Sequence, residues 1–137
     1  MAQFPLAGLL RLRGIELDAA SGRLAGANRR VQESRERRAR SVSSLGACDT
    51  HPADGPALLA IAAARSAARS QLAALDALIT TADAEQQAAQ AQYRAAKMRT
   101  VPLEKMAARH QLEQTAAELK AEQSALDESA IRRTSSR

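Results

Sequence analysis

The chain has 137 residues, a formal net charge of +5 and an apolar fraction of 45%. Most of that fraction is alanine, and with one Phe, one Tyr and no Trp the chain lacks the large side chains that fill a globular core of this length. Ala, Leu, Arg, Glu and Gln all favour helix, whereas the β-branched and aromatic residues typical of strands are scarce. The composition therefore predicts an all-α protein and excludes a globular domain with a large core.

The first apolar run, residues 4–10, has no basic segment before it and is ended by Arg11 and Arg13. These features disfavour a cleaved signal peptide. No stretch approaches the roughly 20 apolar residues that a membrane-spanning helix needs. We therefore expect contact with a membrane to be peripheral at most.

The first predicted helix covers residues 4–44, with Pro5 in its first turn, where a missing N–H costs nothing. Within it one position recurs every seven residues and is apolar in all but one case: Leu10, Leu17, Leu24, Val31, Arg38 and Leu45. The positions between them are small after the first: Arg13, Ala20, Ala27, Ser34 and Ser41. A seven-residue repeat places its apolar side chains on one face, which a helix can bury only against another helix.

A loop is predicted at residues 46–56, which contain Pro52, Gly55 and Pro56. The chain's one cysteine, Cys48, lies here without a disulfide partner, which fits a reducing cytosol. A second helix is predicted over residues 57–132. Its seam, meaning the residues that face the other helix, alternates steps of three and four: Leu58, Ile61, Arg65, Ala68, Leu72, Leu75, Ile79, Ala82, Gln86, Ala89, Tyr93 and Ala96.

Pro102 predicts a kink or a restart at residues 100–102, with Thr100 as a candidate cap. Beyond it an apolar stripe resumes in a shifted phase: Leu112, Ala116, Leu119, Leu126 and Ala130. Residues 133–137 are expected to fray. These elements predict one domain over residues 1–137, a long two-helix antiparallel coiled-coil hairpin whose second helix overhangs the first. At 1.5 Å per residue, folding back at the loop would bring Phe4 level with about residue 97.

Catalytic and cofactor motifs are missing from the sequence. His51 and His110 would lie far apart on a hairpin, and there is no Gly-rich phosphate loop, HExxH or CxxC. We therefore expect no enzymatic activity, no metal site and no cofactor.

The sharpest local feature is a basic run in the first helix: Arg29, Arg30, Arg35, Arg37, Arg38 and Arg40. Such a run can bind the phosphates of nucleic acid or of an anionic membrane. It can equally be a solvated helix face or a protein-binding surface, partly neutralised by Glu33 and Glu36. Because stacking aromatics are scarce, nucleic acid is not expected as a partner.

Two segments together resemble the FliJ family of flagellar type III export proteins, which is related to the YscO-like stalk proteins of injectisomes. The first is FPLAGLLRLR at residues 4–13, leading into Asp18-Ala19-Ala20 and Leu24-Ala25. The second comprises Leu103-Glu104-Lys105-Met106, then Arg109, and Ala121-Glu122-Gln123-Ser124-Ala125-Leu126-Asp127-Glu128, similar to the family's "LEKL…R…EQxxLDE" pattern. The chain departs from the family in Pro102, in its Ala-rich middle and in its short first helix.

The resemblance implies a hairpin that stands in the pore of the hexameric flagellar export ATPase and points its tip at the membrane export gate. It also implies binding of substrate chaperones and a cytoplasmic protein peripherally associated with the cell membrane. On this basis the residues expected to contact the ATPase lie near both termini: Leu6, Leu9, Leu10, Arg13, Glu122, Gln123, Leu126, Asp127 and Glu128. Those expected to contact the gate or a chaperone lie near the tip: Arg35, Arg37, Arg38 and Arg40.

Three other interpretations stay open at the level of the sequence. The terminal leucines can simply pack on one another while the nearby carboxylates are solvated. The basic helix can bind nucleic acid or an anionic membrane. The chain can also be a general coiled-coil adaptor or a homodimer, in which the same seams pair between two copies.

Overall fold

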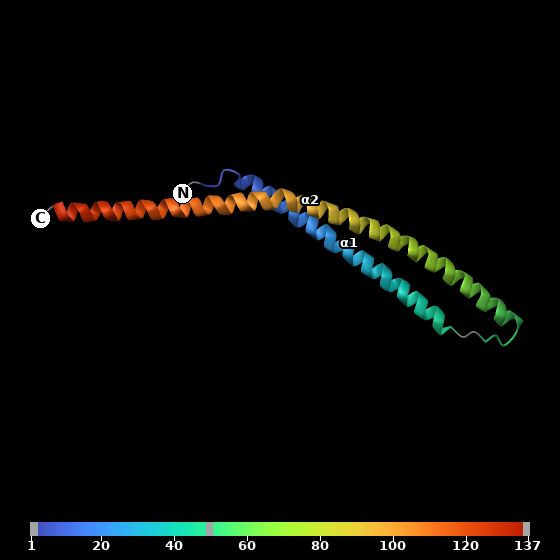
Figure 1. Ribbon diagram of the computed structural model, residues 1–137. Coiled ribbons are helices and arrows are strands. Elements are labelled where there is room, and N and C mark those ends of the chain that lie inside the picture. The colour runs from blue at the N-terminus through green and yellow to red at the C-terminus, as the bar shows by residue number, and fades with distance from the viewer. Residues whose placement is uncertain (1–2, 49–50, 136–137) are drawn as a thin grey trace. The chain divides into compact units, whose positions relative to one another are not determined.

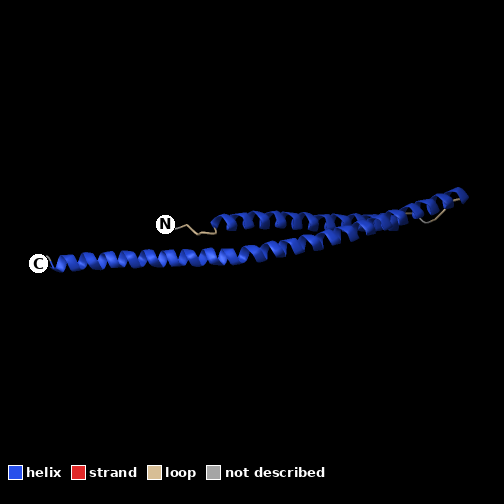
Figure 2. Ribbon diagram, turned by 90° about the horizontal axis from the view of Figure 1, so that it is seen from above, coloured by secondary structure: helices blue, strands red, loops and turns tan. Residues whose placement is uncertain are grey.

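The computed structural model describes residues 3–48 and 51–135. It contains α1, Ala7–Ala47, and α2, Gly55–Ser135 (Figure 1). Helices and loops account for all of the described residues (Figure 2). The two helices run antiparallel, because Asn28 bonds to Gln86 while Arg38, further along α1, bonds to Asp76. The predicted all-α hairpin is confirmed.

Contacts within the chain divide it into two compact units. Unit 1 comprises Met1–Asp18 with Ala95–Arg137, and unit 2 comprises Ala19–Arg94. Each unit therefore contains a segment of both helices. A single domain over the whole chain stays a prediction, and the units are treated separately below.

The start and the end of α1 each lie three residues beyond the predicted positions of 4 and 44. Phe4 to Ala7 form a turn closed by the Ala7 N–H and the Phe4 carbonyl, 3.0 Å apart, since the residue before a proline avoids helical geometry. At the other end Leu45 and Gly46 remain helical. The nearest proline is Pro52, so no backbone constraint ends the helix at residue 44.

Helix α2 begins at Gly55 rather than at residue 57 because Asp54 caps it. The Oδ1 of Asp54 accepts a hydrogen bond from the N–H of Ala57 at 2.8 Å. This bond satisfies one of the donors that the first turn of a helix leaves unpaired, and Pro56 fits that turn because it has no donor. The described part of the loop is therefore shorter than the predicted 46–56, since residues 46, 47, 55 and 56 are helical.

Helix α2 continues through Pro102 in one segment, so the expected restart is wrong. Pro102 has no N–H to donate to the carbonyl of Met98, four residues earlier. Met98 is 77% exposed, so water can bond to this carbonyl instead. Thr100 does not cap a helix. It is a buried interior residue, 1% exposed. The helix also includes residues 133–135 of the tail that is expected to fray, while residues 136–137 lie outside the described residues.

In unit 2 the predicted seam of α1 faces α2 throughout, with every seam position from Ala20 to Leu45 buried or half-buried. The most buried apolar residues of this unit are almost all alanine: Ala20, Ala27, Val31, Ala82 and Ala89. Alanine side chains allow two helix backbones to approach closely and lose no rotamer freedom on burial. Two predicted seam residues of α2 are instead exposed, Leu58 and Arg65.

The register of the two helices differs from the predicted one. Phe4 lies against His110, with ring centroids 5.7 Å apart, and not level with residue 97. The symmetric fold-back assumed from the sequence is wrong because the first turns of α2 extend past the end of α1 (Figure 1). Leu58 and Leu59, 57% and 73% exposed, lie in this unpaired stretch.

Candidate interaction surfaces

Carboxylates of α2 hold part of the basic run of α1 in unit 2. Arg30 pairs with Glu85 and Arg35 with Asp83, each at 3.1 Å, and the Nε of Arg38 donates to Oδ1 of Asp76. That hydrogen bond and the charge of Asp76 raise the pKa of the Arg38 guanidinium. Because all six side chains are between 35% and 59% exposed, each pair contributes little stability. Their main effect is to fix the register.

The predicted tip residues therefore fall into two classes. Arg35 and Arg38 are engaged within the hairpin, whereas Arg37 and Arg40 form no ion pair with any described residue. This division depends on which residue of α2 lies opposite each arginine. The heptad pattern of α1 alone does not supply that information.

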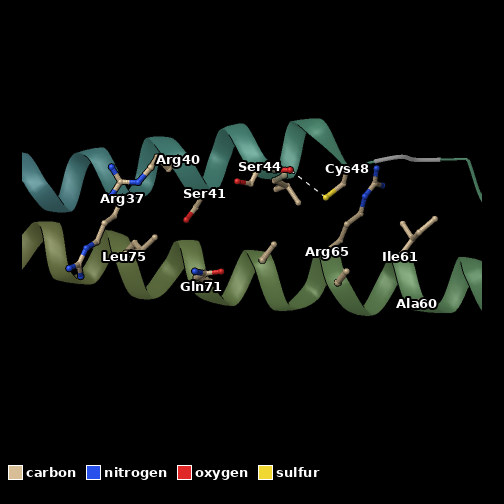
Figure 3. Close-up of a pocket in the computed structure, with 13 residues that line it drawn as sticks. Arg37, Arg40, Ser41, Ser44, Cys48, Ala60, Ile61, Arg65, Gln71 and Leu75 are labelled. Carbon is tan, nitrogen blue, oxygen red and sulfur yellow. Dashed lines mark hydrogen bonds between the residues drawn. The ribbon is translucent and has the colours of Figure 1, made fainter.

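Arg37 and Arg40 line a cavity of about 760 Å³ between the last turns of α1 and the first turns of α2 (Figure 3). We call it the loop-end cavity. Its apolar lining includes Leu45, Ile61 and Leu75. Figure 3 shows Arg65 reaching across from α2 toward Cys48, whose thiol donates to the Ser44 carbonyl at 3.4 Å.

The sequence indicates why the helices part here. Arg65 occupies a seam position, and its charged head cannot be buried without a matched partner. The neighbouring seam residues Ser41 and Ala68 are too small to fill the space that results. A second cavity, of about 270 Å³, shares Ile61 and Arg65 with the first and adds Arg69.

Neither cavity has an Asp or Glu among its described lining residues. Four arginines at their walls form no ion pair with a described residue: Arg37, Arg40, Arg65 and Arg69. The surface is thus apolar at its base and cationic at its rim. Arg65 and Arg69 were not among the predicted site residues. The signal that could have found them is Arg65 itself, a charged residue at a seam position.

In unit 1 the face of α2 that packs on α1 continues the seam without a phase shift. Its residues are buried or half-buried: Ala96, Thr100, Leu103, Ala107, His110 and Gln114. The Oγ1 of Thr100 lies 2.8 Å from the Ala96 carbonyl oxygen and 3.2 Å from that of Arg13. This contact ties α2 directly to the backbone of α1.

The apolar stripe predicted beyond Pro102 is not part of that packing. Leu112, Leu119 and Leu126 are 72%, 61% and 68% exposed. At 100° per residue they lie on the face of α2 nearly opposite to Leu103, Ala107 and His110. We call this face the outer stripe, and it comprises Leu112, Ala116, Leu119, Gln123, Leu126 and Ala130.

The residues predicted to contact an ATPase do not form one cluster in unit 1. Leu10 and Arg13 are half-buried in the pairing of the helices, and Arg13 also bonds to Glu16 at 2.8 Å. Leu6 and Leu9 are 36% and 39% exposed. The second group lies on α2 beyond His110, the residue that Phe4 contacts, and is exposed: Glu122, Gln123, Leu126, Asp127 and Glu128.

The acidic residues beside the outer stripe are largely available for contact. Glu113, Glu122 and Asp127 flank the stripe and form no ion pair with a described residue, whereas Glu128 lies 3.5 Å from Arg132. Between residues 112 and 130 the one basic residue on these flanks is Lys120, and Arg109 and Arg133 lie on the same edges just beyond the two ends of the stripe. The outer stripe is therefore an apolar surface with acidic edges.

Among the described residues no group of three or more His, Cys, Asp or Glu side chains is placed to bind a metal. None of the described helical segments combines the length and the hydropathy needed to span a membrane.

The comparison with protein families agrees with the resemblance noted in the sequence. The family model described as "Flagellar FliJ protein" matches residues 1–137, the whole chain. Neither a curated protein nor a solved structure matches the chain.

Proposed function

Since the chain belongs to the FliJ family and is thereby related to flagellar export, we propose that it is a non-enzymatic stalk of the export apparatus. In this role it inserts into the ring of the export ATPase and couples the ring to the membrane export gate. Its partners are the ATPase hexamer, the gate and substrate chaperones. It acts in the cytoplasm, at the inner face of the cell membrane.

The observation that carries this proposal is the outer stripe. A single helix in water gains nothing from an exposed apolar row, and such a row with polar edges is typical of a protein-binding surface. Leu112, Leu119 and Leu126 are exposed and lie beyond His110, the residue that Phe4 contacts. We propose that Glu122, Gln123, Leu126, Asp127 and Glu128 contact the ATPase there, supported by Leu6, Leu9, Leu10 and Arg13 at the other terminus.

Coupling of this kind needs no reactive group. An asymmetric coiled coil presents different faces to the six equivalent subunits of a ring. Its contacts then differ from subunit to subunit, and this difference can bias which conformation each subunit adopts. Such differences come from the outer stripe of α2, which is apolar with acidic edges, and from the face of α1 that carries the arginines.

The gate contact is assigned to the arginines that the hairpin itself does not use. Arg37 and Arg40 have no acidic partner among the described residues, so they are the better candidates for an acidic surface on the gate or a chaperone. Arg35 and Arg38 would first have to leave Asp83 and Asp76. We propose that Arg37 and Arg40 dominate this contact.

The ATPase contact is tested with the double variant Leu126→Asp and Asp127→Lys. We expect it to abolish stimulation of the cognate export ATPase and to reduce motility, while leaving the helical content unchanged because both residues are exposed. The matched control is Ala121→Asp, on the opposite face of the same helix. Unchanged stimulation and motility in the double variant would contradict the proposed contact.

The gate contact is tested with Arg37→Glu and Arg40→Glu together, against Arg29→Glu as an exposed control on the same helix. Binding to the gate should weaken in the double variant and with rising salt, because exposed charges are screened over about 8 Å at physiological ionic strength. Gate binding that responds to neither salt nor charge reversal would exclude an electrostatic contact.

A further inference from the structure

The strongest unexplained features are the loop-end cavity of unit 2 and the outer stripe of unit 1. We propose that they bind each other between two copies of this chain. In the resulting dimer, the outer stripe of each copy occupies the loop-end cavity of the other. The proposal goes beyond the coupling function, and it would hold even if the ATPase contact were wrong.

Charge is the first argument for this pairing. The cavity and its smaller neighbour carry Arg37, Arg40, Arg65 and Arg69, with no carboxylate among their described lining residues. Between residues 112 and 130 the outer stripe is edged by Glu113, Glu122 and Asp127, with Lys120 as the opposing charge, while Arg109 and Arg133 lie beyond its two ends. An acidic-edged helix and a basic-rimmed cavity attract each other and repel a second copy of themselves.

Size and apolar character are the second argument. The cavity extends along α2 from Ala60 to Leu75, roughly 22 Å at 1.5 Å per residue, and the outer stripe from Leu112 to Leu126 is roughly 21 Å long. Leu45, Ile61 and Leu75 line the cavity, and three exposed leucines project from the stripe. An apolar helix face inserting into a groove between two other helices is a common mode of recognition.

The distribution of the arginines favours a helix over a lipid as the occupant. Arg37 and Arg40 lie two to three turns before the end of α1, opposite the region of Asp76, whereas Arg65 and Arg69 lie on α2 nearer the loop. A lipid concentrates its charge in one headgroup and leaves the rest of its length apolar. A helix with carboxylates at intervals along both edges matches charges that are spread along the cavity.

A second copy supplies this helix for a topological reason. The cavity lining and the outer stripe both belong to the one uninterrupted helix that runs from Gly55 to Ser135. Residues 76–111 of that helix separate the two surfaces along the chain. Two copies related by a twofold axis satisfy both surfaces at once, and the assembly closes as a dimer instead of growing into a filament.

Self-association would then compete with the proposed function. The same contact covers Leu126 and Asp127, assigned to the ATPase, and Arg37 and Arg40, assigned to the gate. A dimer would keep both surfaces covered until a partner displaces the second copy. This consequence rests on the proposed function, whereas the dimer itself does not.

The lone cysteine allows a direct test by crosslinking. Cys48 is exposed and lines the cavity, so the native chain carries one thiol at the required place. It is mixed with a second chain that carries Cys48→Ala and Gln123→Cys, which places its thiol on the outer stripe. The matched control carries Cys48→Ala and Ala121→Cys, with the thiol on the opposite face, two residues or 200° away.

With a short bis-maleimide we expect a heterodimer between Cys48 and residue 123 in several-fold excess over the control with residue 121. Equal crosslinking of the two positions would overturn the proposal, because the contact would then not involve the outer stripe. Absence of crosslinked product at both positions would also overturn it.

The second test is the dissociation constant of the dimer, measured by sedimentation equilibrium over a series of concentrations. Leu119→Asp should raise it by at least about tenfold, since a central apolar anchor is lost, and Arg65→Glu and higher salt should raise it as well. Circular dichroism checks that the helix persists, and Ala121→Asp is the control. A native chain that stays monomeric throughout would contradict the proposal.

Vesicles of phosphatidylglycerol test the alternative occupant. If they protect Cys48 of the native chain from a thiol reagent while the chain remains monomeric, the cavity binds lipid and the dimer is excluded. If Cys48 is protected by raising the protein concentration but not by vesicles, the dimer is supported.

Discussion

The two units use the same kinds of residue in opposite ways. In unit 2 the apolar side chains of both helices face each other across a seam of alanines, and three arginines of α1 bond to carboxylates of α2. In unit 1, beyond the contact of Phe4 with His110, the leucines of α2 face outward and most of the carboxylates beside them are unpaired. Apolar and charged side chains are therefore paired between the helices in unit 2, whereas in unit 1 they are left exposed on one face of α2.

The largest effect is expected from a charge placed in the alanine seam of unit 2, which tests whether the two helices are closely packed there. Ala27 is 1% exposed, and Ala27→Glu would bury a carboxylate without a partner. We expect the free energy of unfolding to fall by at least about 2 kcal/mol, measured by urea denaturation. Ala25→Glu, at an exposed position two residues away, should change it by less than about 0.5 kcal/mol. A tolerated Ala27→Glu would show that the seam is not closely packed.

A comparison of two leucines separates packing from exposure. Leu24 is half-buried in the seam, and Leu24→Ala should lower the free energy of unfolding by about 1–2 kcal/mol through lost apolar burial. Leu119→Ala, in the outer stripe, should lower it by less than about 0.5 kcal/mol. Equal losses in urea denaturation of the monomer would mean that the stripe is packed after all.

A substitution at Thr100 tests how much its contact with the backbone of α1 contributes to the stability of unit 1. Thr100→Val keeps the shape and removes the hydroxyl that lies 3.2 Å from the Arg13 carbonyl oxygen. The expected loss is about 1 kcal/mol, the net value of a typical hydrogen bond, and thermal unfolding would measure it. Thr115→Val is the control, because that hydroxyl bonds only within its own helix, to Gln111, and is exposed.

The smallest expected effect concerns the exposed ion pairs of unit 2. Asp83→Asn removes the partner of Arg35 and should lower the free energy of unfolding by less than about 1 kcal/mol, and by still less in high salt.

The same variant leaves Arg35 without its partner on α2. A retardation assay with duplex DNA should still show no binding at moderate salt. Tight binding with a steep salt dependence would instead favour the nucleic-acid interpretation of the basic run.

The seam was predictable from the sequence, while the register was not. Positions such as Ala20, Ala27 and Val31 follow from a seven-residue repeat, which depends only on the geometry of one helix. The position of α1 along α2 depends on the path of the connection between Ala47 and Gly55. The seven-residue repeat predicts neither the cap at Asp54 nor the number of turns of α2 that precede its first contact with α1.

The division of the tip arginines into paired and unpaired ones follows from the register. Arg35 and Arg38 could not be separated from Arg37 and Arg40 without knowing that Asp83 and Asp76 lie opposite the first two. The outer stripe, in contrast, was visible as a shifted repeat of Leu112, Leu119 and Leu126. Sequence periodicity shows that two faces exist, and the structure shows which face packs on α1.

The alanine seam also affects how the hairpin opens. Each alanine contributes little apolar area, so no single layer of the seam dominates its stability. The two helices can then separate stepwise, one layer after another from an end of the seam, instead of in one concerted step. Amide hydrogen exchange should accordingly be slowest around Ala27 and Ala89 and become faster toward the loop, where the loop-end cavity has already parted the helices.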